Sequence, residues 1–109
     1  MPYDDGYAAL MREALGTDDN FTERKMFGGL CFMHNGHMVC GVHAGGGMAR
    51  VGKAAEAAAI ELAGIEPLSF TGRKMGGMVD VSGDVLADEA RLLQIVALAL
   101  EYVKTLPPK

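Results

Sequence analysis

The sequence has 109 residues and a formal net charge of −4 at pH 7. A chain of this length fits a single domain over residues 1–109 and can bury a stable core. Its longest apolar run, Ile95–Leu100, is far shorter than the roughly 20 residues that cross a bilayer, and its start, MPYDDGYAAL, lacks the basic and apolar regions of a signal peptide. We therefore expect a cytoplasmic protein with no membrane segment, and the acidic charge argues against a dedicated nucleic-acid binder.

Apolar spacing, helix caps and turn residues predict an α+β domain in the order α-β-β-β-α-β-α, with about three helices packed on an antiparallel sheet. The pair Asn35–Gly36 is the strongest short-range signal for a two-residue type I′ hairpin. The segment KAAEAAAIELAG is typical of a helix closed by a glycine. In chain order we expect a helix capped by Asp4 or Asp5 that ends near 15, then strands at about 26–34, 37–43 and 48–52. A helix at 53–64, a strand at 73–82, and a helix that starts within 84–88 and ends near 105 follow.

The last predicted helix is apolar on nearly every side. Leu92, Ile95 and Val96 lie on its main stripe, whereas Leu93 and Leu98 lie outside that stripe. A small domain buries such a helix most readily by pairing with another subunit. We therefore expect a homodimer.

The predicted hairpin fixes where its cysteines point. With Asn35 and Gly36 in the turn, Cys31 lies opposite Cys40, at a spacing close enough for a disulfide. In a reducing cytoplasm, two buried free thiols are the favoured interpretation. A small thiol-dependent redox protein that uses both cysteines stays open as an alternative.

The hairpin also contains histidines at zinc-like spacing, since CFMHNGHMVC can be written C-x2-H-x2-H-x2-C. Strand residues alternate between the two faces, so the sulfurs and the imidazoles project to opposite sides of the predicted hairpin. We therefore expect no metal and no other cofactor, and solvent-facing or rim positions for His34, His37 and His43.

Two segments repeat one arrangement: ERKMFGGLCFM at 23–33 and GRKMGGMVDV at 72–81. In each, two cations and a methionine precede glycines and an apolar strand. The packing interpretation is that the glycines permit close backbone approach and the methionines, Met26 and Met75, enter the core. The functional interpretation is that the cations bind an anion or an acidic partner surface. We expect the segments to lie near each other in the sheet and to form one basic rim: Arg24, Lys25, Arg50, Lys53, Arg73 and Lys74.

Four stretches resemble, in the right order, the N-terminal domain of the TfoX/Sxy family of competence regulators: RKMFGGLCFMHNGHMVCGV, MARVG, PLSFTGRKMGGMVDV and ALALEYVKTLPP. The resemblance covers nearly the whole chain. It implies a compact α+β domain with an antiparallel sheet and no catalytic set, and we expect no C-terminal helical domain of the kind that the full-length regulators carry. It also marks the family motif as Arg24, Met26, Gly28, Gly29, Arg73, Met75 and Gly77.

The sequence therefore predicts a non-enzymatic regulatory or protein-interaction module with an unidentified protein partner. The first alternative is a nucleic-acid or anion-binding domain that uses the six basic residues of the predicted rim. The second is the redox protein centred on Cys31 and Cys40.

Overall fold

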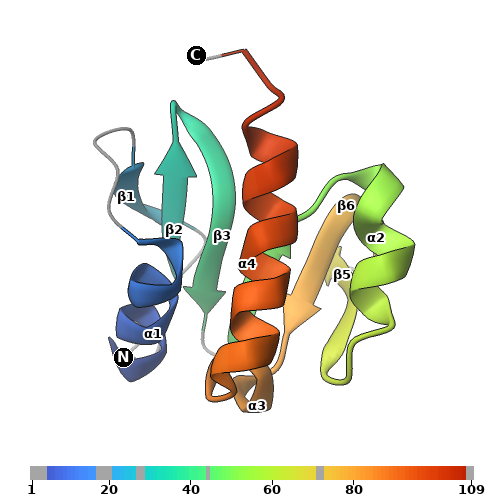
Figure 1. Ribbon diagram of the computed structural model, residues 1–109, viewed down its shortest axis with the longest axis horizontal. Coiled ribbons are helices and arrows are strands. Elements are labelled where there is room, and N and C mark those ends of the chain that lie inside the picture. Colours follow the sequence, from blue (N-terminus) through green and yellow to red (C-terminus); the bar gives the residue numbers. More distant parts are fainter. Residues whose placement is uncertain (1–4, 17–20, 27–28, 44, 71–72, 108–109) are drawn as a thin grey trace.

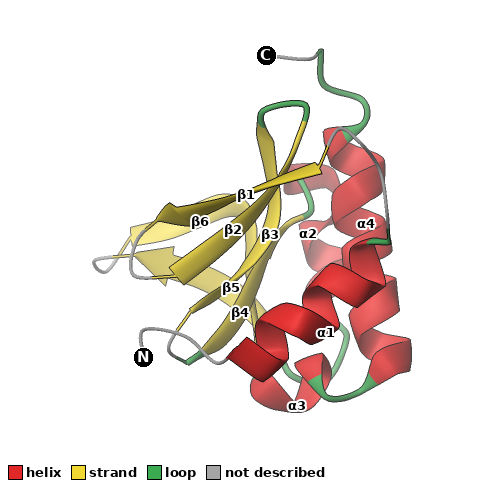
Figure 2. Cartoon of the chain, turned by 90° about the vertical axis from the view of Figure 1, so that its left-hand side faces the viewer, coloured by secondary structure: helices red, strands yellow, loops and turns green. Residues whose placement is uncertain are grey.

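A six-stranded antiparallel sheet forms the centre of the computed structural model, which describes residues 5–16, 21–26, 29–43, 45–70 and 73–107 (Figure 1). The strands are β1 (Phe21–Met26), β2 (Gly29–His34), β3 (His37–His43), β4 (Gly46–Arg50), β5 (Ile65–Phe70) and β6 (Arg73–Val81). The helices are α1 (Asp5–Leu15), α2 (Lys53–Ile60), α3 (Gly83–Leu86) and α4 (Glu89–Val103). The strand order is β1-β2-β3-β4-β6-β5, and the helices lie on one face of the curved sheet (Figure 2). The predicted fold class, α+β with an antiparallel sheet, is confirmed.

The two strands that the sequence did not predict, β1 and β5, are the two edges of the sheet. In β1 the side chains from Thr22 to Lys25 are exposed, so no alternation of buried apolar residues marks the strand. β5 contains Pro67, which cannot donate to a strand ladder and is tolerated at an edge. Charge and proline protect an edge from pairing with other chains. They also remove the pattern by which a strand is predicted.

The predicted last helix is divided into two. The Ser82 hydroxyl accepts a hydrogen bond from the Val85 N–H at 3.4 Å and caps α3. The Asp88 carboxylate accepts one from the Arg91 N–H at 3.2 Å and caps α4. A second N-cap inside the segment therefore ends one helix and starts the next.

The Asn35–Gly36 turn has the predicted type I′ geometry, with φ angles of 51° and 85°. Next to the turn, Met33 pairs with Met38 as expected. Beyond that pair, an irregularity between Phe32 and Met33 shifts the register.

The shift places Phe32 opposite Cys40 and Cys31 opposite Gly41, so the predicted Cys31–Cys40 pairing is wrong. The reason is one extra residue on β3, Val39, which is fully buried on the helical side of the sheet together with Cys40. A β-bulge of this kind exchanges the faces of every residue beyond it.

Each face of the sheet has its own apolar cluster. The larger one lies between the sheet and the helices, and Met11, Leu86 and Ile95 in it are 0% exposed. Burying side chains of this size contributes about 1.5–3 kcal/mol each. The smaller one, here called the methionine cluster, comprises the buried Cys31, Met48 and Met78 with the partly buried Met33 and Met38. Among the described residues, no helix is both long and apolar enough to span a bilayer.

An ion pair fastens α1 to the edge strand β1. The Arg12 guanidinium donates to both carboxylate oxygens of Glu23, at 2.6 and 2.9 Å, and lies 5.7 Å from the centroid of the Phe32 ring. Both charged side chains are substantially exposed, so the pair is screened by solvent.

Glu23→Gln should lower the free energy of unfolding by at most about 1 kcal/mol at pH 7. The hydrogen bonds from Arg12 hold the pKa of Glu23 below its usual value. A carboxyl group with a lowered folded-state pKa stabilises the fold above its unfolded-state pKa, and this stability is lost as the pH falls through the folded-state pKa. Denaturant titrations should therefore show a difference in the free energy of unfolding between the wild type and Glu23→Gln at pH 7. This difference should disappear about two pH units below the usual glutamate pKa of about 4.3. A difference that persists in acid would contradict this assignment.

Candidate functional site

The strand order separates the two RKM-glycine segments. The first segment ends β1 and begins β2, whereas the second forms the start of β6, and β2, β3 and β4 lie between β1 and β6. The expectation that the segments lie near each other in the sheet is therefore wrong. The physical reason is that strand order depends on long-range pairing, which the similarity of two local segments does not encode.

The six predicted basic residues accordingly fall into two groups. Arg24 and Lys25 are exposed on the edge strand β1. Arg50 ends β4 and pairs with Met78 of β6, and Lys53 begins α2. Arg73 and Lys74 begin β6, but their side chains lie outside the described part of the structure, as do those of Met26 and Met75 and the whole of Gly28.

Arg50 and Lys53 meet at a cleft of about 460 Å³ between α2, β6 and the end of α4. We call it the Arg50–Lys53 cleft. The Arg50 guanidinium carbon lies 5.5 Å from the centroid of the Tyr102 ring, a cation–π contact that orients the side chain. The described residues that line the cleft are Arg50, Gly52, Lys53, Ala54, Gly76, Gly77 and Tyr102.

Glycines of the second motif allow β6 to reach the start of α2. Gly77 has a φ of 81°, and a Cβ on it would lie 3.1 Å from the backbone nitrogen of Lys53. The Gly77 N–H donates to Glu56 Oε1 at 2.8 Å, and the Gly77 carbonyl accepts from the N–H groups of Val51 and Gly52 at 2.9 and 3.0 Å. Gly76 faces the Lys53 stem, whose Cε would lie 2.9 Å from an added Cβ.

The first motif also contains a packing glycine. A Cβ on Gly29 would collide with the Val42 carbonyl oxygen of β3. Close backbone approach therefore explains both Gly29 and Gly77, as the packing interpretation proposed. This role of the glycines is compatible with a separate role for the cations.

The cleft is electrostatically suited to an anion. Gly52 provides no side-chain cap to α2, and a helix N-terminus carries a partial positive charge that adds to the charges of Arg50 and Lys53. The one acid in the first turn, Glu56, is held by the Gly77 N–H. A guanidinium and an ammonium group in the lining of one cleft suit a carboxylate or a phosphate.

The cysteines lie on opposite faces of the sheet as free thiols: Cys31 in the methionine cluster and Cys40 in the helix-side core. Burial raises the pKa of the Cys40 thiol strongly, with a further contribution from Cys31. Burial also raises the pKa of Cys31. The disulfide-ready pair on which the redox alternative depended is therefore not formed, and neither thiol has the lowered pKa of a reactive cysteine.

The histidines occupy three different environments. His34 is 5% exposed and meets the Phe21 ring edge-on at 5.1 Å, so the expected solvent-facing position is wrong for it. His37 Nε2 lies 2.6 Å from the Pro107 carbonyl oxygen. The described residues contain no group of three or more His, Cys, Asp or Glu side chains arranged to hold a metal.

His43 forms a pair with Asp80 that the sequence did not reveal. Its Nδ1 accepts a hydrogen bond from the Gly45 N–H at 3.0 Å, so its Nε2 carries the proton and donates to Asp80 Oδ1 at 2.9 Å. The two residues come from β3 and β6, and no local spacing signals their contact. The pair ties the β3–β4 turn to β6.

The sheet with helices on one face, and the cleft lined by Arg50 and Lys53 at one end of those helices, define a small α+β domain. A family model described as the TfoX N-terminal domain matches residues 13–103. The match covers most of the chain and includes both RKM-glycine segments, so the chain belongs to the TfoX N-terminal domain family. The resemblance read from the sequence is thereby confirmed. No curated protein and no solved structure matches the chain.

Gly52→Ala should destabilise the domain more than Gly16→Ala does. Both glycines have positive φ, 84° and 80°, and backbone strain alone costs about 1–2 kcal/mol for an L-residue. Only at Gly52 would the new Cβ meet a neighbour, the Tyr102 ring at 2.5 Å, which adds about 1–3 kcal/mol of overpacking. Chemical denaturation measures both losses.

The matched test is Tyr102→Ala in each background. Removal of the ring should recover part of the loss in Gly52→Ala and none of the loss in Gly16→Ala. Equal losses in the two glycine variants would contradict the proposed backbone–ring contact.

Proposed function

We propose that the chain is a non-enzymatic regulatory module that acts in the cytoplasm by binding an acidic surface of another protein at the Arg50–Lys53 cleft. Membership in the TfoX N-terminal domain family supports a competence-regulator-like role. The observation that carries the proposal is the convergence of two cations, from β4 and α2, on one cleft beside a helix N-terminus. A carboxylate is the protein group that such a site binds best, because a guanidinium can donate to both of its oxygens.

The nucleic-acid alternative is less well supported by the arrangement of charge. Duplex DNA presents one phosphate charge per about 1.7 Å of helix axis, and DNA-binding domains usually bind this backbone through a continuous basic surface. Here the strands β2 and β3 separate the Arg24–Lys25 pair on β1 from Arg50 at the end of β4. The net charge of −4 also opposes non-specific attraction to DNA.

Charge reversal at the cleft, Arg50→Glu with Lys53→Glu, should abolish partner binding while the fold persists. A photo-cross-linking amino acid at Ala54, an exposed lining residue, reports binding in the native cell. We expect one protein adduct that this double variant loses, because the reversed charges repel an acidic surface. Mass spectrometry identifies the adduct.

The matched control is Arg24→Glu with Lys25→Glu, which makes the same change of charge on β1 and should retain the adduct. Three results contradict the proposal: no protein adduct, an adduct that survives charge reversal at the cleft, or an adduct to nucleic acid. The last result would favour the nucleic-acid alternative.

The homodimer is part of the same proposal. The helices leave the other face of the sheet open to a partner, and that face carries the methionine cluster (Figure 2). Met33 and Met38 are its partly exposed members, and methionine side chains adapt to varied apolar contacts. The apolar side chains of the methionine cluster can meet their own copies across a two-fold axis without bringing like charges together.

Sedimentation at micromolar concentration should therefore show a dimer. The double variant Met33→Lys with Met38→Glu should be monomeric, because it places charges on the proposed interface. The fold should persist, because opposite charges are favourable at this cross-strand pair. Leu93→Glu, on the helical side, should leave the dimer intact. A wild-type monomer, or a dimer that survives the double substitution, would contradict self-association through this face.

A further inference from the structure

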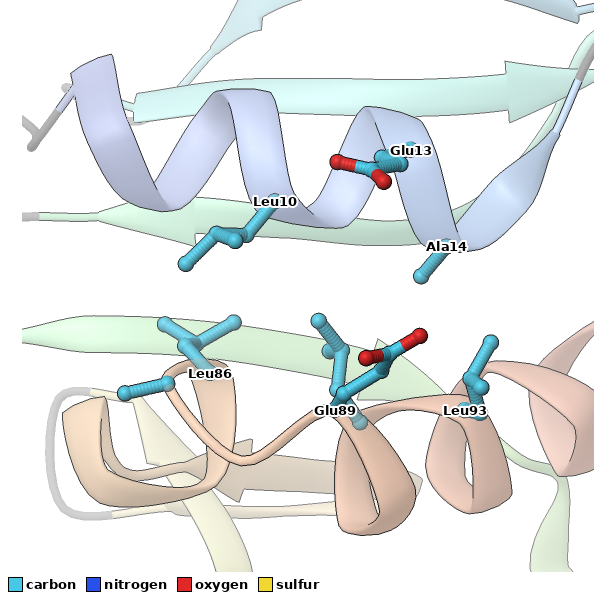
Figure 3. Close-up of a pocket in the computed structure, with 8 residues that line it drawn as sticks. Leu10, Glu13, Ala14, Leu86, Glu89 and Leu93 are labelled. Carbon is cyan, nitrogen blue, oxygen red and sulfur yellow. The ribbon is translucent and has the colours of Figure 1, made fainter.

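A second groove, on the helical side of the molecule, separates α1 from the corner between α3 and α4 (Figure 3). Its volume is about 310 Å³. We call it the α1–α4 groove. The residues that line it are Leu10, Glu13, Ala14, Leu86, Ala87, Glu89, Leu92 and Leu93.

The groove has an apolar floor and apolar lips. Leu86 and Leu92 are buried at 0% and 3% exposure and form the floor. Leu10 and Leu93 are 39% and 45% exposed and project from the opposite walls (Figure 3). Among the described residues, the exposed large apolar side chains are these two and Ile60 on α2. Two of the three therefore gather at one groove, as expected of a docking site.

Two carboxylates flank the same groove, Glu13 on α1 and Glu89 on α4 (Figure 3). Neither forms an ion pair with another described residue. The nearby cations are engaged elsewhere: Arg12 with Glu23, and Arg91 with Asp88 and the Ala63 carbonyl.

Helix stability explains only one of these acids. Glu89 lies in the first turn of α4, where the helix dipole favours an anion. Glu13 lies in the last turn of α1, where the dipole disfavours an anion. Two negative charges on opposite walls of an apolar groove are complementary to a ligand that is both apolar and cationic.

We propose that the α1–α4 groove docks a cationic amphipathic helix of another protein. An apolar side chain of that helix enters the groove between Leu10 and Leu93, and Lys or Arg side chains beside it meet Glu13 and Glu89. This is the helix-in-groove mode of recognition, with charge pairs at the rim. Symmetric docking of a second copy is disfavoured, because it would bring the carboxylates of both copies together.

The inference goes beyond the Arg50–Lys53 cleft, since it concerns a separate surface of opposite charge. Leu93 of the groove and Tyr102 of the cleft lie nine residues apart on α4, or about 14 Å along the helix axis. A module with both sites would bridge a basic helix of one protein and an acidic surface of another.

The test uses a fluorescent model peptide with a leucine stripe flanked by lysines at helical spacing, and the same peptide with glutamates in place of the lysines. Fluorescence anisotropy gives Kd, and methyl NMR spectra show which leucines respond. We expect the lysine peptide to bind with shifts at Leu10 and Leu93, and the glutamate peptide not to bind. Glu13→Gln with Glu89→Gln should raise Kd about tenfold, and Leu10→Ser with Leu93→Ser should abolish binding.

The matched control is Ile60→Ser, a change of the same kind at a side chain of similar exposure, 38%, on α2, and it should leave Kd unchanged. Arg50→Glu with Lys53→Glu should also leave Kd unchanged, so failure of the cleft and failure of the groove are distinguishable. The proposal is overturned if the lysine peptide does not bind, if the glutamate peptide binds equally well, if Ile60→Ser weakens binding as much as the groove variants do, or if the leucine methyl signals of the groove do not move.

Discussion

The backbone contact between β6 and the start of α2 is the constraint on which the rest of the structure depends. It requires residues without side chains at the crossing, and Gly77 and Gly52 meet that requirement with positive φ angles. The Gly77 carbonyl accepts hydrogen bonds from two N–H groups of the turn before α2, and the Gly77 N–H donates a hydrogen bond to the Glu56 carboxylate. The contact sets the position of α2 against the sheet. Lys53, at the start of α2, thereby lines the same cleft as Arg50, whose guanidinium lies over the Tyr102 ring of α4.

What could be predicted from the sequence is what neighbouring residues encode. The Asn35–Gly36 turn and the α+β class each follow from local pattern, and the family follows from motifs in order. The bulge at Val39 could not be predicted, because a single extra residue is favoured only by packing against helices that lie far away in sequence. The edge strands were not predicted, because the charged residues of β1 and Pro67 of β5 interrupt the apolar pattern that indicates a strand.

The candidate site was predicted in part, for the same reason. Arg50 and Lys53 are close in sequence, so a single strand pairing, β4 with β6, is enough to bring both of them beside the second glycine motif. The position of the Arg24–Lys25 pair depends on the order of all the strands. That order places the pair on the edge strand β1, away from β6. The α1–α4 groove combines exposed leucines from helices at the two ends of the chain. No segment taken alone marks those leucines as neighbours.

The most direct test of the account is a titration of isotope-labelled protein with a glutamate-rich peptide, followed through backbone amide NMR signals. The account predicts a saturable response centred on Gly52, Lys53, Gly76 and Gly77, which weakens as salt screens the charges. A response centred on Arg24 and Lys25 of β1, or no response at the cleft amides, would contradict the assignment of the Arg50–Lys53 cleft as the binding site.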